Sequence, residues 1–421
     1  MILVTLMCIC FWQTEPLILE ESKLWTRKVE SPNLISIEIV SRKYEASEQP
    51  DIWLVGVAHI ADGYFYEEVT SLLDGMDIVL FESVRPTGSR PPGGESDREK
   101  VESTRLALDF VADIVKLIAE EEGEIPNSLD EVIANSVLLD SRIASWVTDA
   151  SIGPWGRPFA MQVNPEDRTV ALWCFGSDGK VGGSGVAADM FVTRDIVFSE
   201  ELAELSEEQS VQEGMADALD LEFQLDSISY DNPNWFCSDL TIGEVEQNLA
   251  ERGSDLAILD VIRGRAFTAK IATGMMKLLP ILNTLVGGGI KETARLLMIE
   301  ILTMPNSDEI FDGIDPELNE VIIIDRNTEV LEDIEATIAT VEDLTSIGIL
   351  YGAGHMKDLA QRLEEDFGYM STEEKWFVAM SVNPNDSLLD QSDLKQMKFM
   401  LQYQMKKSKD QEEKLNIDLE D

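Results

Sequence analysis

Two histidines are the residues of this chain best suited to chemistry. They are His59 and His355, the only histidines among the 421 residues. Each ends a Gly-x-x-His motif that directly follows a short apolar run, from Gly56 in the first copy and from Gly352 in the second. Imidazole binds transition metals and transfers protons near neutral pH. Because the two motifs use the whole supply of histidine, we expect both side chains to act together.

A glutamate is expected to join the first histidine. Residues 51–57 and 77–81 have the apolar character of strands, and residues 67–73 between them have helical spacing. After Asp77 the run 77–81 is continuously apolar to Phe81, which is typical of a central parallel strand, and Glu82 follows it. A right-handed βαβ crossover brings the ends of both strands to one edge of the sheet. The pattern therefore predicts that His59 and Glu82 are neighbours.

These three side chains could hold one metal ion. His59 and His355 would be two ligands, and Glu82 would be either the third ligand or the base that deprotonates a metal-bound water. Two imidazoles with carboxylates suit Mn, Co, Zn or Fe without choosing among them. A metal can bring the pKa of its bound water to about 7. Hydroxide would then be available at neutral pH.

Arg326 is the candidate cation beside this site. It could hold a carboxylate, either of the substrate or of Glu82, or it could stabilise an oxyanion. It could equally be a structural partner of Asp325 or of a buried acid, and the sequence leaves both interpretations open. The catalytic candidates are therefore Glu82, Arg326, His59 and His355.

The composition narrows the possible partners. The formal net charge is −47, from 33 basic and 80 acidic residues. Such a surface repels phosphate backbones and anionic membranes, so we exclude nucleic acid and expect a peptide or small-molecule substrate. The four cysteines show no paired CxxC spacing, which predicts neither a zinc ribbon nor a disulfide scaffold. The sequence leaves the oligomeric state open.

Two apolar regions bear on location. Residues 2–12 form an apolar run broken only by Thr5, without a basic flank or a clear cleavage site. The run is too short to span a bilayer as a helix, so it is either a degraded export signal or a first strand. Residues 261–304 are interrupted by charged residues, proline and glycine, and they predict two packed core helices rather than a membrane span. We expect a soluble protein, either cytoplasmic or exported.

The expected fold class is α/β, with a central mainly parallel or mixed sheet flanked by helices. A strand, a Gly-x-x-His and a helix closed by glycine occur twice, which suggests two related halves. We expect one domain over residues 34–382, with insertions at about 85–215 and a helical region at about 241–305. Residues 1–33 would precede this domain as an N-terminal segment, and residues 383–421 would follow it as a charged tail.

The remaining elements follow from periodicity and turn residues. Expected helices are 100–122, 129–139, 241–252, 328–340 and 359–367, expected strands are 34–40, 346–351 and 375–382, and residues 154–197 are expected to form a hairpin insertion. Residues 85–95 predict a flexible loop, and residues 229–239 predict an ordered loop without regular structure. Residues 321–327 are either a buried strand or the start of a helix.

With both motifs placed, the chain resembles the TraB/GumN family, which includes the Tiki metalloproteases. Members carry a Gly-x-x-His near each end of the domain, a Glu after the strand that follows the first motif, and an Arg-Asn pair upstream of the second. The matching residues here are Gly56, His59, Glu82, Arg326, Asn327, Gly352 and His355. The segment from Leu221 to Asp239 also resembles a middle block of bacterial members. Asp325 stands where many relatives have Glu, and residues 170–215 look like an insertion.

The resemblance implies a fold related to the erythromycin-esterase and haem-binding ChaN-like proteins, and a metal-dependent peptidase activity that only some members possess. It favours a hydrolase that cleaves peptide amides with water activated by the two histidines and Glu82. Two other functions stay open. One is a metal-free, esterase-like hydrolase in which the histidines act with Glu82 as acid and base. The other is a non-catalytic module that binds or sequesters a peptide, haem or a metal.

Overall fold

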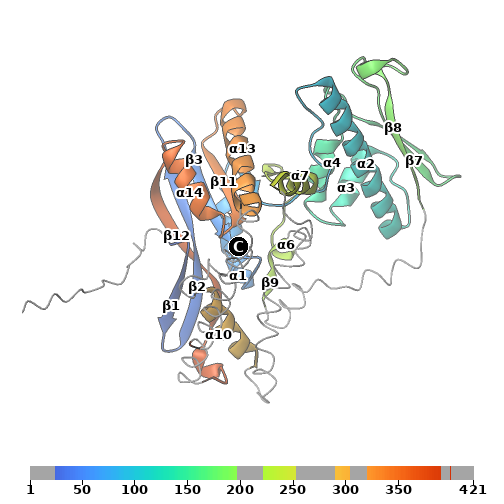
Figure 1. The fold of residues 1–421 in the computed structure, drawn as a ribbon. Helices are drawn as coiled ribbons and strands as arrows, with labels where there is room; N and C mark the ends of the chain where they lie inside the picture. The colour runs from blue at the N-terminus through green and yellow to red at the C-terminus, as the bar shows by residue number, and fades with distance from the viewer. Residues whose placement is uncertain (1–23, 197–220, 253–289, 304–319, 390–398, 400–421) are drawn as a thin grey trace, which may run out of the picture.

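A mixed sheet forms the centre of the fold (Figure 1). The computed structural model of the protein describes residues 24–196, 221–252, 290–303, 320–389 and 399. Within these residues the sheet has seven strands in the order β1-β2-β3-β11-β5-β10, and β12 pairs with β2. The strands are β1 (Thr26–Ser31), β2 (Leu34–Glu45), β3 (Asp51–Val57), β5 (Ile78–Phe81), β10 (Trp235–Cys237), β11 (Ser346–Gly352) and β12 (Met370–Val382).

The four strands at the β10 side of the sheet run parallel, and the rest are antiparallel. β11 pairs parallel with β3 on one side and with β5 on the other, and β10 pairs parallel with β5. β2 is long enough to pair along its length with β12 while it shares its other side between β1 and β3. The antiparallel strands therefore widen the sheet. The four parallel strands have their carboxyl ends at one edge, which is described below.

Alternating side chains of the central strands build two cores, one on each face. In β3, Trp53 and Val55 belong to the first core, and Ile52 and Leu54 belong to the second. Helices α1 (Gly63–Leu73) and α10 (Ile290–Leu302) cover the first face, and α13 (Arg326–Thr340) and α14 (Met356–Glu365) cover the second. The helices that follow the two Gly-x-x-His motifs, α1 and α14, thus lie on opposite faces of the sheet.

A second lobe is inserted after β5, shown in green on the right of Figure 1. It contains α2 (Asp97–Glu122), α3 (Leu129–Ser136), α4 (Ile143–Ala150) and the antiparallel strands β6 (Ala160–Asn164), β7 (Thr169–Cys174) and β8 (Met190–Asp195). α2 begins in a capping box between Ser96 and Glu99, which satisfies the first backbone N–H groups of the helix. The first core runs without a break from the sheet into this lobe.

Short elements complete the description. β4 (Ile60–Ala61) pairs with β9 (Glu222–Phe223), and α6 (Gln224–Ser227) follows directly. α7 (Ile242–Arg252) follows β10, and a π-helical turn over Glu320–Asp325 leads into α13. π-helical turns are rare and occur often at functional sites.

The predicted α/β class with a mixed sheet flanked by helices is confirmed. The expected strands and helices occur, with ends shifted by a few residues, and β1 begins eight residues before the expected domain boundary at residue 34. Within residues 154–196, the expected antiparallel insertion is formed by β6, β7 and β8. Of the two alternatives for residues 321–327, the helical start is confirmed.

One expectation is wrong. Residues 229–239 are not free of regular structure, because Trp235–Cys237 form β10 at the edge of the parallel sheet. Three residues are too few to show a strand periodicity among turn-forming neighbours. The strands β3 and β5 end at one edge of the sheet without pairing directly, since β11 lies between them. A strand from the other end of the chain inserts there, which local pattern does not reveal.

Several predictions concern segments outside the described residues. They are the apolar run 2–12, most of the apolar region 261–304, residues 197–215 of the expected insertion and most of the tail 383–421. Among the helices that the structure describes, none combines the length and apolar character needed to cross a bilayer.

Candidate functional site

Four neighbouring parallel strands end at one edge of the sheet, and each is followed by a polar side chain. Along the sheet these are His59 after β3, His355 after β11, Glu82 after β5 and Asp239 after β10. The last residues of β3 and β11 pair with each other, and those of β5 and β10 pair with each other at the level of Leu350, two residues before the end of β11. The carboxyl edge of parallel strands is where α/β proteins bind their ligands. The structure thus brings the three predicted residues to one edge and adds an aspartate.

Glu82 is a fixed anion in the middle of this edge. Its Oε1 lies 2.6 Å from Arg326 Nη2 and 3.5 Å from His355 Nε2, and its Oε2 accepts a 2.6 Å hydrogen bond from the Gly352 N–H. Burial would raise the pKa of the Glu82 carboxyl, but Arg326, His355 and, less strongly, His59 outweigh it and hold that pKa well below its usual range. Glu82 is therefore ionised at neutral pH.

Arg326 joins this glutamate to a second buried acid. Its Nε and Nη2 donate to the two carboxylate oxygens of Asp239 at 2.8 and 2.6 Å, a bidentate arrangement, and the Asp239 side chain is 0% exposed. Burial would lower the pKa of Arg326, but Asp239 and Glu82 raise it well above its usual value. Asp325 pairs with Arg252 instead, at 2.8 Å. Two interpretations of Arg326 were open, and the structure supports the one in which it binds carboxylates of the protein, those of Asp239 and Glu82.

His355 is buried and held by its neighbours. It is the N-cap residue of α14, and its Nδ1 lies 2.7 Å from Asn327 Oδ1 on α13. The ring packs edge-on against Tyr351, with centroids 5.2 Å apart, and the Tyr351 hydroxyl donates to the Ser238 carbonyl. Asn327 and Tyr351 thus hold this imidazole, and its Nε2 is directed to Glu82 and Arg326.

His59 is exposed, and a segment from the middle of the chain positions it. Its Nδ1 lies 3.1 Å from Gln224 Oε1, and its backbone carbonyl accepts a 2.9 Å hydrogen bond from the Gln224 N–H. Gln224 Nε2 lies 3.0 Å from the hydroxyl of the buried Tyr230. The Tyr66 hydroxyl donates to the Ala58 carbonyl at 2.9 Å, which fixes the backbone just before the histidine.

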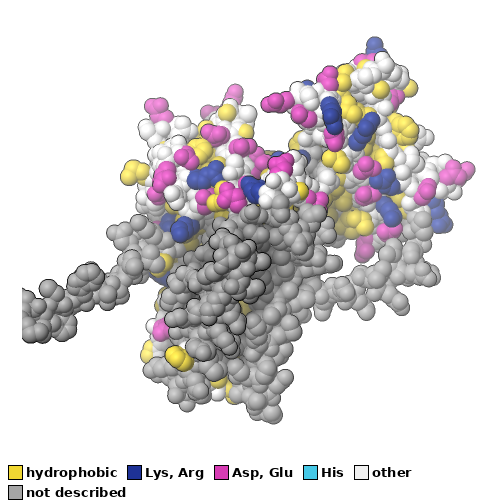
Figure 2. Space-filling view, in the orientation of Figure 1, with side chains coloured by type: hydrophobic (Ala, Val, Ile, Leu, Met, Phe, Trp, Pro, Cys, Tyr) yellow, Lys and Arg dark blue, Asp and Glu magenta, His cyan; other side chains and the backbone are white. Residues whose placement is uncertain are grey.

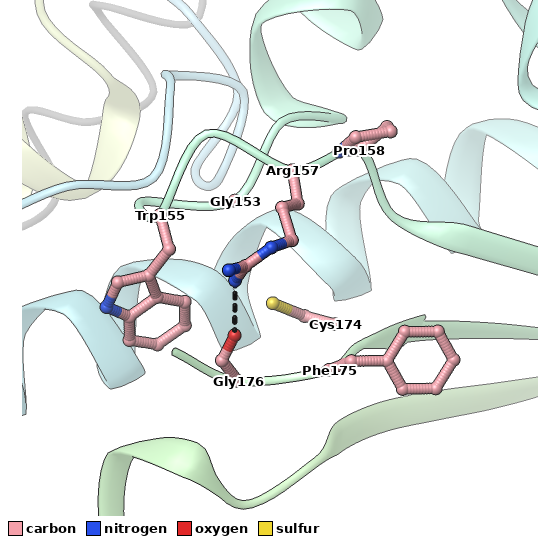
Figure 3. A pocket seen from close by; sticks show the side chains of 7 residues that line it. All are labelled: Gly153, Trp155, Arg157, Pro158, Cys174, Phe175 and Gly176. Carbon is pink, nitrogen blue, oxygen red and sulfur yellow. Dashed lines mark hydrogen bonds between the residues drawn. The ribbon is translucent and has the colours of Figure 1, made fainter. Parts of the chain in front are cut away.

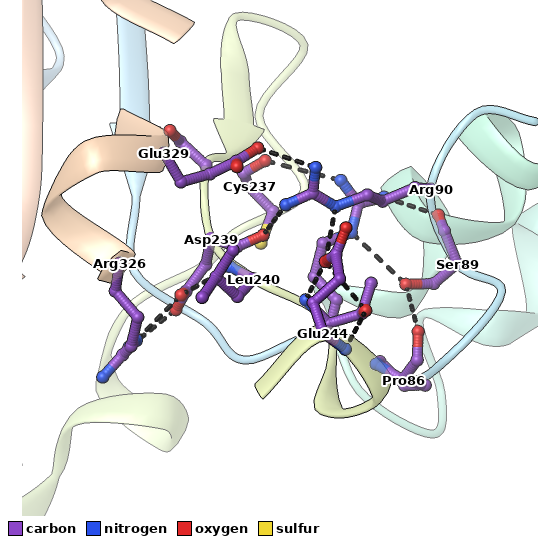
Figure 4. A network of polar contacts seen from close by, with 12 residues as sticks. Pro86, Ser89, Arg90, Cys237, Asp239, Leu240, Glu244, Arg326 and Glu329 are labelled. Carbon is purple, nitrogen blue, oxygen red and sulfur yellow. Dashed lines mark hydrogen bonds and ion pairs between the residues drawn. The ribbon is translucent and has the colours of Figure 1, made fainter. Parts of the chain in front are cut away.

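A salt-bridge network around Arg90 supports the backbone of Asp239 (Figure 4). Arg90 Nη2 donates to the Asp239 backbone carbonyl at 2.8 Å, and the same guanidinium pairs with Glu329 of α13 at 2.7 Å and Glu244 of α7 at 3.3 Å. Arg90 belongs to the loop 85–95, which was expected to be flexible because of its Pro and Gly content. Arg90 ties this loop to α7 and α13, and Ser89 is fully buried.

The glycine that begins the second motif leaves little space for a side chain. A Cβ on Gly352 would lie 3.2 Å from Glu82 Oε2, the oxygen that accepts the Gly352 N–H. A Cβ on Gly354, two residues later, would meet nothing within 4 Å. The first glycine thus permits the strand end to approach the carboxylate, and the second has no such role.

We expect Gly352→Ala to displace Glu82 and lower the free energy of unfolding by about 1 kcal/mol, at the low end of overpacking effects. Gly354→Ala is the matched control and should leave stability within about 0.5 kcal/mol of wild type, as for a surface change. Urea unfolding of the three proteins measures both. Equal losses for the two variants would contradict the steric role of Gly352.

The depressed pKa of Glu82 predicts a specific acid sensitivity. A carboxyl whose folded pKa lies below its unfolded value stabilises the fold above that unfolded value, about 4.3 for glutamate. The contribution is lost as the pH falls from there through the folded pKa. Urea unfolding between about pH 6 and 3 should therefore show a shallower acid loss of stability in Glu82→Gln than in wild type. The exposed Glu67→Gln is the control, and a Glu82→Gln curve parallel to wild type would contradict the prediction.

The two hollows described next are not lined by the residues of this edge. A small cavity of about 50 Å³ lies in the inserted lobe between Trp155, Arg157 and Cys174 (Figure 3). An open groove runs between α1 and β12, past Tyr64, Glu67 and Lys375. In the view of Figure 2, Asp and Glu side chains are spread over both lobes, as the net charge predicts.

The donor atoms at this edge are of the types that bind a metal, but their arrangement is not that of a metal site. The donors, two imidazoles and an ionised carboxylate, are those that bind Mn, Co, Zn or Fe. With Arg326 and Asp239, the ionised Glu82 leaves an excess negative charge that a cation would balance. Among the described residues, however, no three His, Cys, Asp or Glu side chains lie close enough together to hold a metal. The three-ligand set of His59, His355 and Glu82 stays a prediction.

Sequence reasoning missed three residues that shape this site. Asp239 lay in the segment wrongly expected to lack a strand, although that segment belongs to the middle block that resembles bacterial TraB/GumN proteins. Gln224 lies in the same block, and Asn327 is the second residue of the Arg-Asn pair. The resemblance contained all three, but neither their spacing nor their type indicated a contact with a histidine or with Arg326.

Comparisons with known proteins add no relative. No family model, curated protein or solved structure matches the chain. The likeness to the TraB/GumN family therefore rests on the motifs quoted above.

Proposed function

We propose that the chain is a hydrolase of the TraB/GumN type that cleaves peptide amides with a water activated at the edge of the parallel sheet. The observation that supports the proposal is that His355 Nε2 lies 3.5 Å from the ionised Glu82, while His59 follows the end of the strand next to that of His355. Amide hydrolysis needs a group that takes a proton from water near neutral pH, and imidazole and carboxylate both serve.

In the first form of the proposal, a divalent transition metal (Mn, Co, Zn or Fe) assists. His59 and His355 would hold it, with Glu82 as third ligand or base, and the metal would lower the pKa of a bound water. The residues of the chain have separate tasks. Asn327 and Gln224 hold the imidazoles, while Arg326 and Asp239 hold Glu82 in place as an anion.

In the second form, the same residues act without a metal, and Arg326 supplies the fixed positive charge. The guanidinium lies 2.6 Å from Glu82 Oε1 and 3.5 Å from His355 Nε2, so a fixed cation already stands beside both groups. His355 would then take the proton from water through Nε2, and Glu82 would stabilise the imidazolium that forms.

One experiment tests the proposal and separates the two forms. Untagged protein is incubated with a peptide library, before and after exhaustive chelation and after addition of Mn, Co, Zn or Fe. Cleavage that disappears on chelation and returns with one metal supports the first form, and cleavage that survives chelation supports the second. Tight peptide binding without any cleavage would contradict both and favour a non-catalytic binding module.

A further inference from the structure

Both histidines present the same ring nitrogen to the same kind of group. His355 Nδ1 meets the side-chain amide oxygen of Asn327 at 2.7 Å, and His59 Nδ1 meets that of Gln224 at 3.1 Å. An amide oxygen can only accept a hydrogen bond. The ring nitrogen that faces it must then carry the hydrogen, which decides the form of a neutral imidazole.

The contacts of the Asn327 amide nitrogen fix the orientation of the whole amide group. Its Nδ2 lies 3.2 Å from the His355 backbone carbonyl and 2.8 Å from Asp358 Oδ2. Both of these oxygens accept, so the nitrogen must face them and the oxygen must face the ring. Asn327 is 0% exposed and His355 is 5% exposed, which leaves no space for water to replace these partners.

The Gln224 amide also turns its oxygen to the ring of its histidine, but fewer contacts fix this orientation. Its backbone N–H donates to the His59 carbonyl at 2.9 Å, which holds the residue against the histidine. Its Nε2 lies 3.0 Å from the Tyr230 hydroxyl, whose ring packs 4.8 Å from Phe81 in the core. A hydroxyl can donate or accept, so this contact permits the orientation without requiring it.

We propose that Asn327 is a positioning residue that places the hydrogen of neutral His355 on Nδ1 and the lone pair on Nε2, and that Gln224 does the same for His59. His355 Nε2 is the atom directed to Glu82 Oε1, 3.5 Å away. The lone pair therefore lies on the side of Glu82, where it can accept a proton or bind a metal. The use of that lone pair in catalysis rests on the proposed function, whereas the position of the hydrogen does not.

Nuclear magnetic resonance of full-length protein labelled with ¹⁵N-histidine tests the inference. The chain has only two imidazoles, so long-range ¹H–¹⁵N correlations resolve each ring, and His59→Gln assigns them. Spectra are recorded over a range of pH in which the neutral rings are observed. We expect the protonated nitrogen of neutral His355, and of His59, to be Nδ1. A neutral His355 with its hydrogen on Nε2 would overturn the proposal.

Variants separate positioning from simple packing. Asn327→Leu removes the acceptor and should shift neutral His355 to a mixture of the two forms. The double exchange Asn327→Asp with Asp358→Asn keeps an acceptor at position 327 for His355 Nδ1. It also keeps an amide donor, now at position 358, for the contact between α13 and α14, so it should restore the Nδ1–H form. The exposed Gln361→Leu is the control and should change neither ring. An unchanged His355 spectrum in a folded Asn327→Leu protein would overturn the positioning role.

Metal binding gives a second readout. If the first form of the proposed function holds, Asn327→Leu should weaken transition-metal binding by about 10–100-fold, as for other groups that orient a ligand histidine. Calorimetric titration with Mn, Co, Zn or Fe alone measures this ratio. A protein with Nδ1–H histidines but no peptide cleavage would leave the inference standing and contradict the proposed function, so the two failures are distinct.

Discussion

Arg326→Met is expected to lower the free energy of unfolding by about 3–5 kcal/mol, because it leaves buried charges without a partner. Asp239 has a fully buried carboxylate whose two oxygens both accept from this guanidinium, and Glu82 Oε1 takes a third hydrogen bond from it. Methionine fills a similar volume but carries no donor. The two acids would then repel each other in a region that water enters poorly.

Urea unfolding at neutral pH measures this effect, and two variants interpret it. Arg326→Lys keeps the charge but cannot bind both Asp239 oxygens in the same way, so its loss should be smaller yet clear. Arg98→Met is the matched control on α2, where the arginine side chain is 91% exposed, and it should change stability by less than about 0.5 kcal/mol. A folded Arg326→Met protein as stable as wild type would show that the buried network is not needed for the fold.

His355→Ala is expected to lower the rate of peptide cleavage by about 10²–10⁴-fold, the usual contribution of a group that transfers a proton. The substrate is a peptide found by the library screen. The change removes Nε2 beside Glu82 and also removes the partner of Asn327 Oδ1. Unfolding curves recorded in parallel separate lost chemistry from lost structure.

The control for this prediction is an exposed residue of the same helix. Lys357→Ala on α14 lies two residues away and outside the contacts of the site, so it should leave the rate unchanged. A His355→Ala protein that cleaves at the wild-type rate would remove this imidazole from the proposed reaction.

The strand ends and their common edge could be predicted because they depend on local pattern. Apolar runs that end in glycine and a polar residue predict strands that deliver side chains to one edge of an α/β sheet. His59, Glu82 and His355 were assigned to that edge on these grounds, and the structure places the three strand ends there.

The partners of these residues could not be predicted because they depend on contacts between distant segments. Asp239 and Arg326 are separated by 87 positions in the sequence, and His59 and Gln224 by 165. β10 has only three residues, so no periodicity marked the strand that carries Asp239 to the site. The place of β11 between β3 and β5 likewise depends on which strands pair, and a single strand's pattern does not contain that information.

The most direct test of a shared site is the metal content of untagged protein, measured by elemental analysis beside His59→Ala and His355→Ala. We predict about one transition-metal ion per chain after loading with Mn, Co, Zn or Fe, and its loss in both variants, as for an ion that depends on both imidazoles. Wild-type protein that stays empty after all four loadings, or a variant that keeps its full metal content, would contradict a metal site shared by the two histidines.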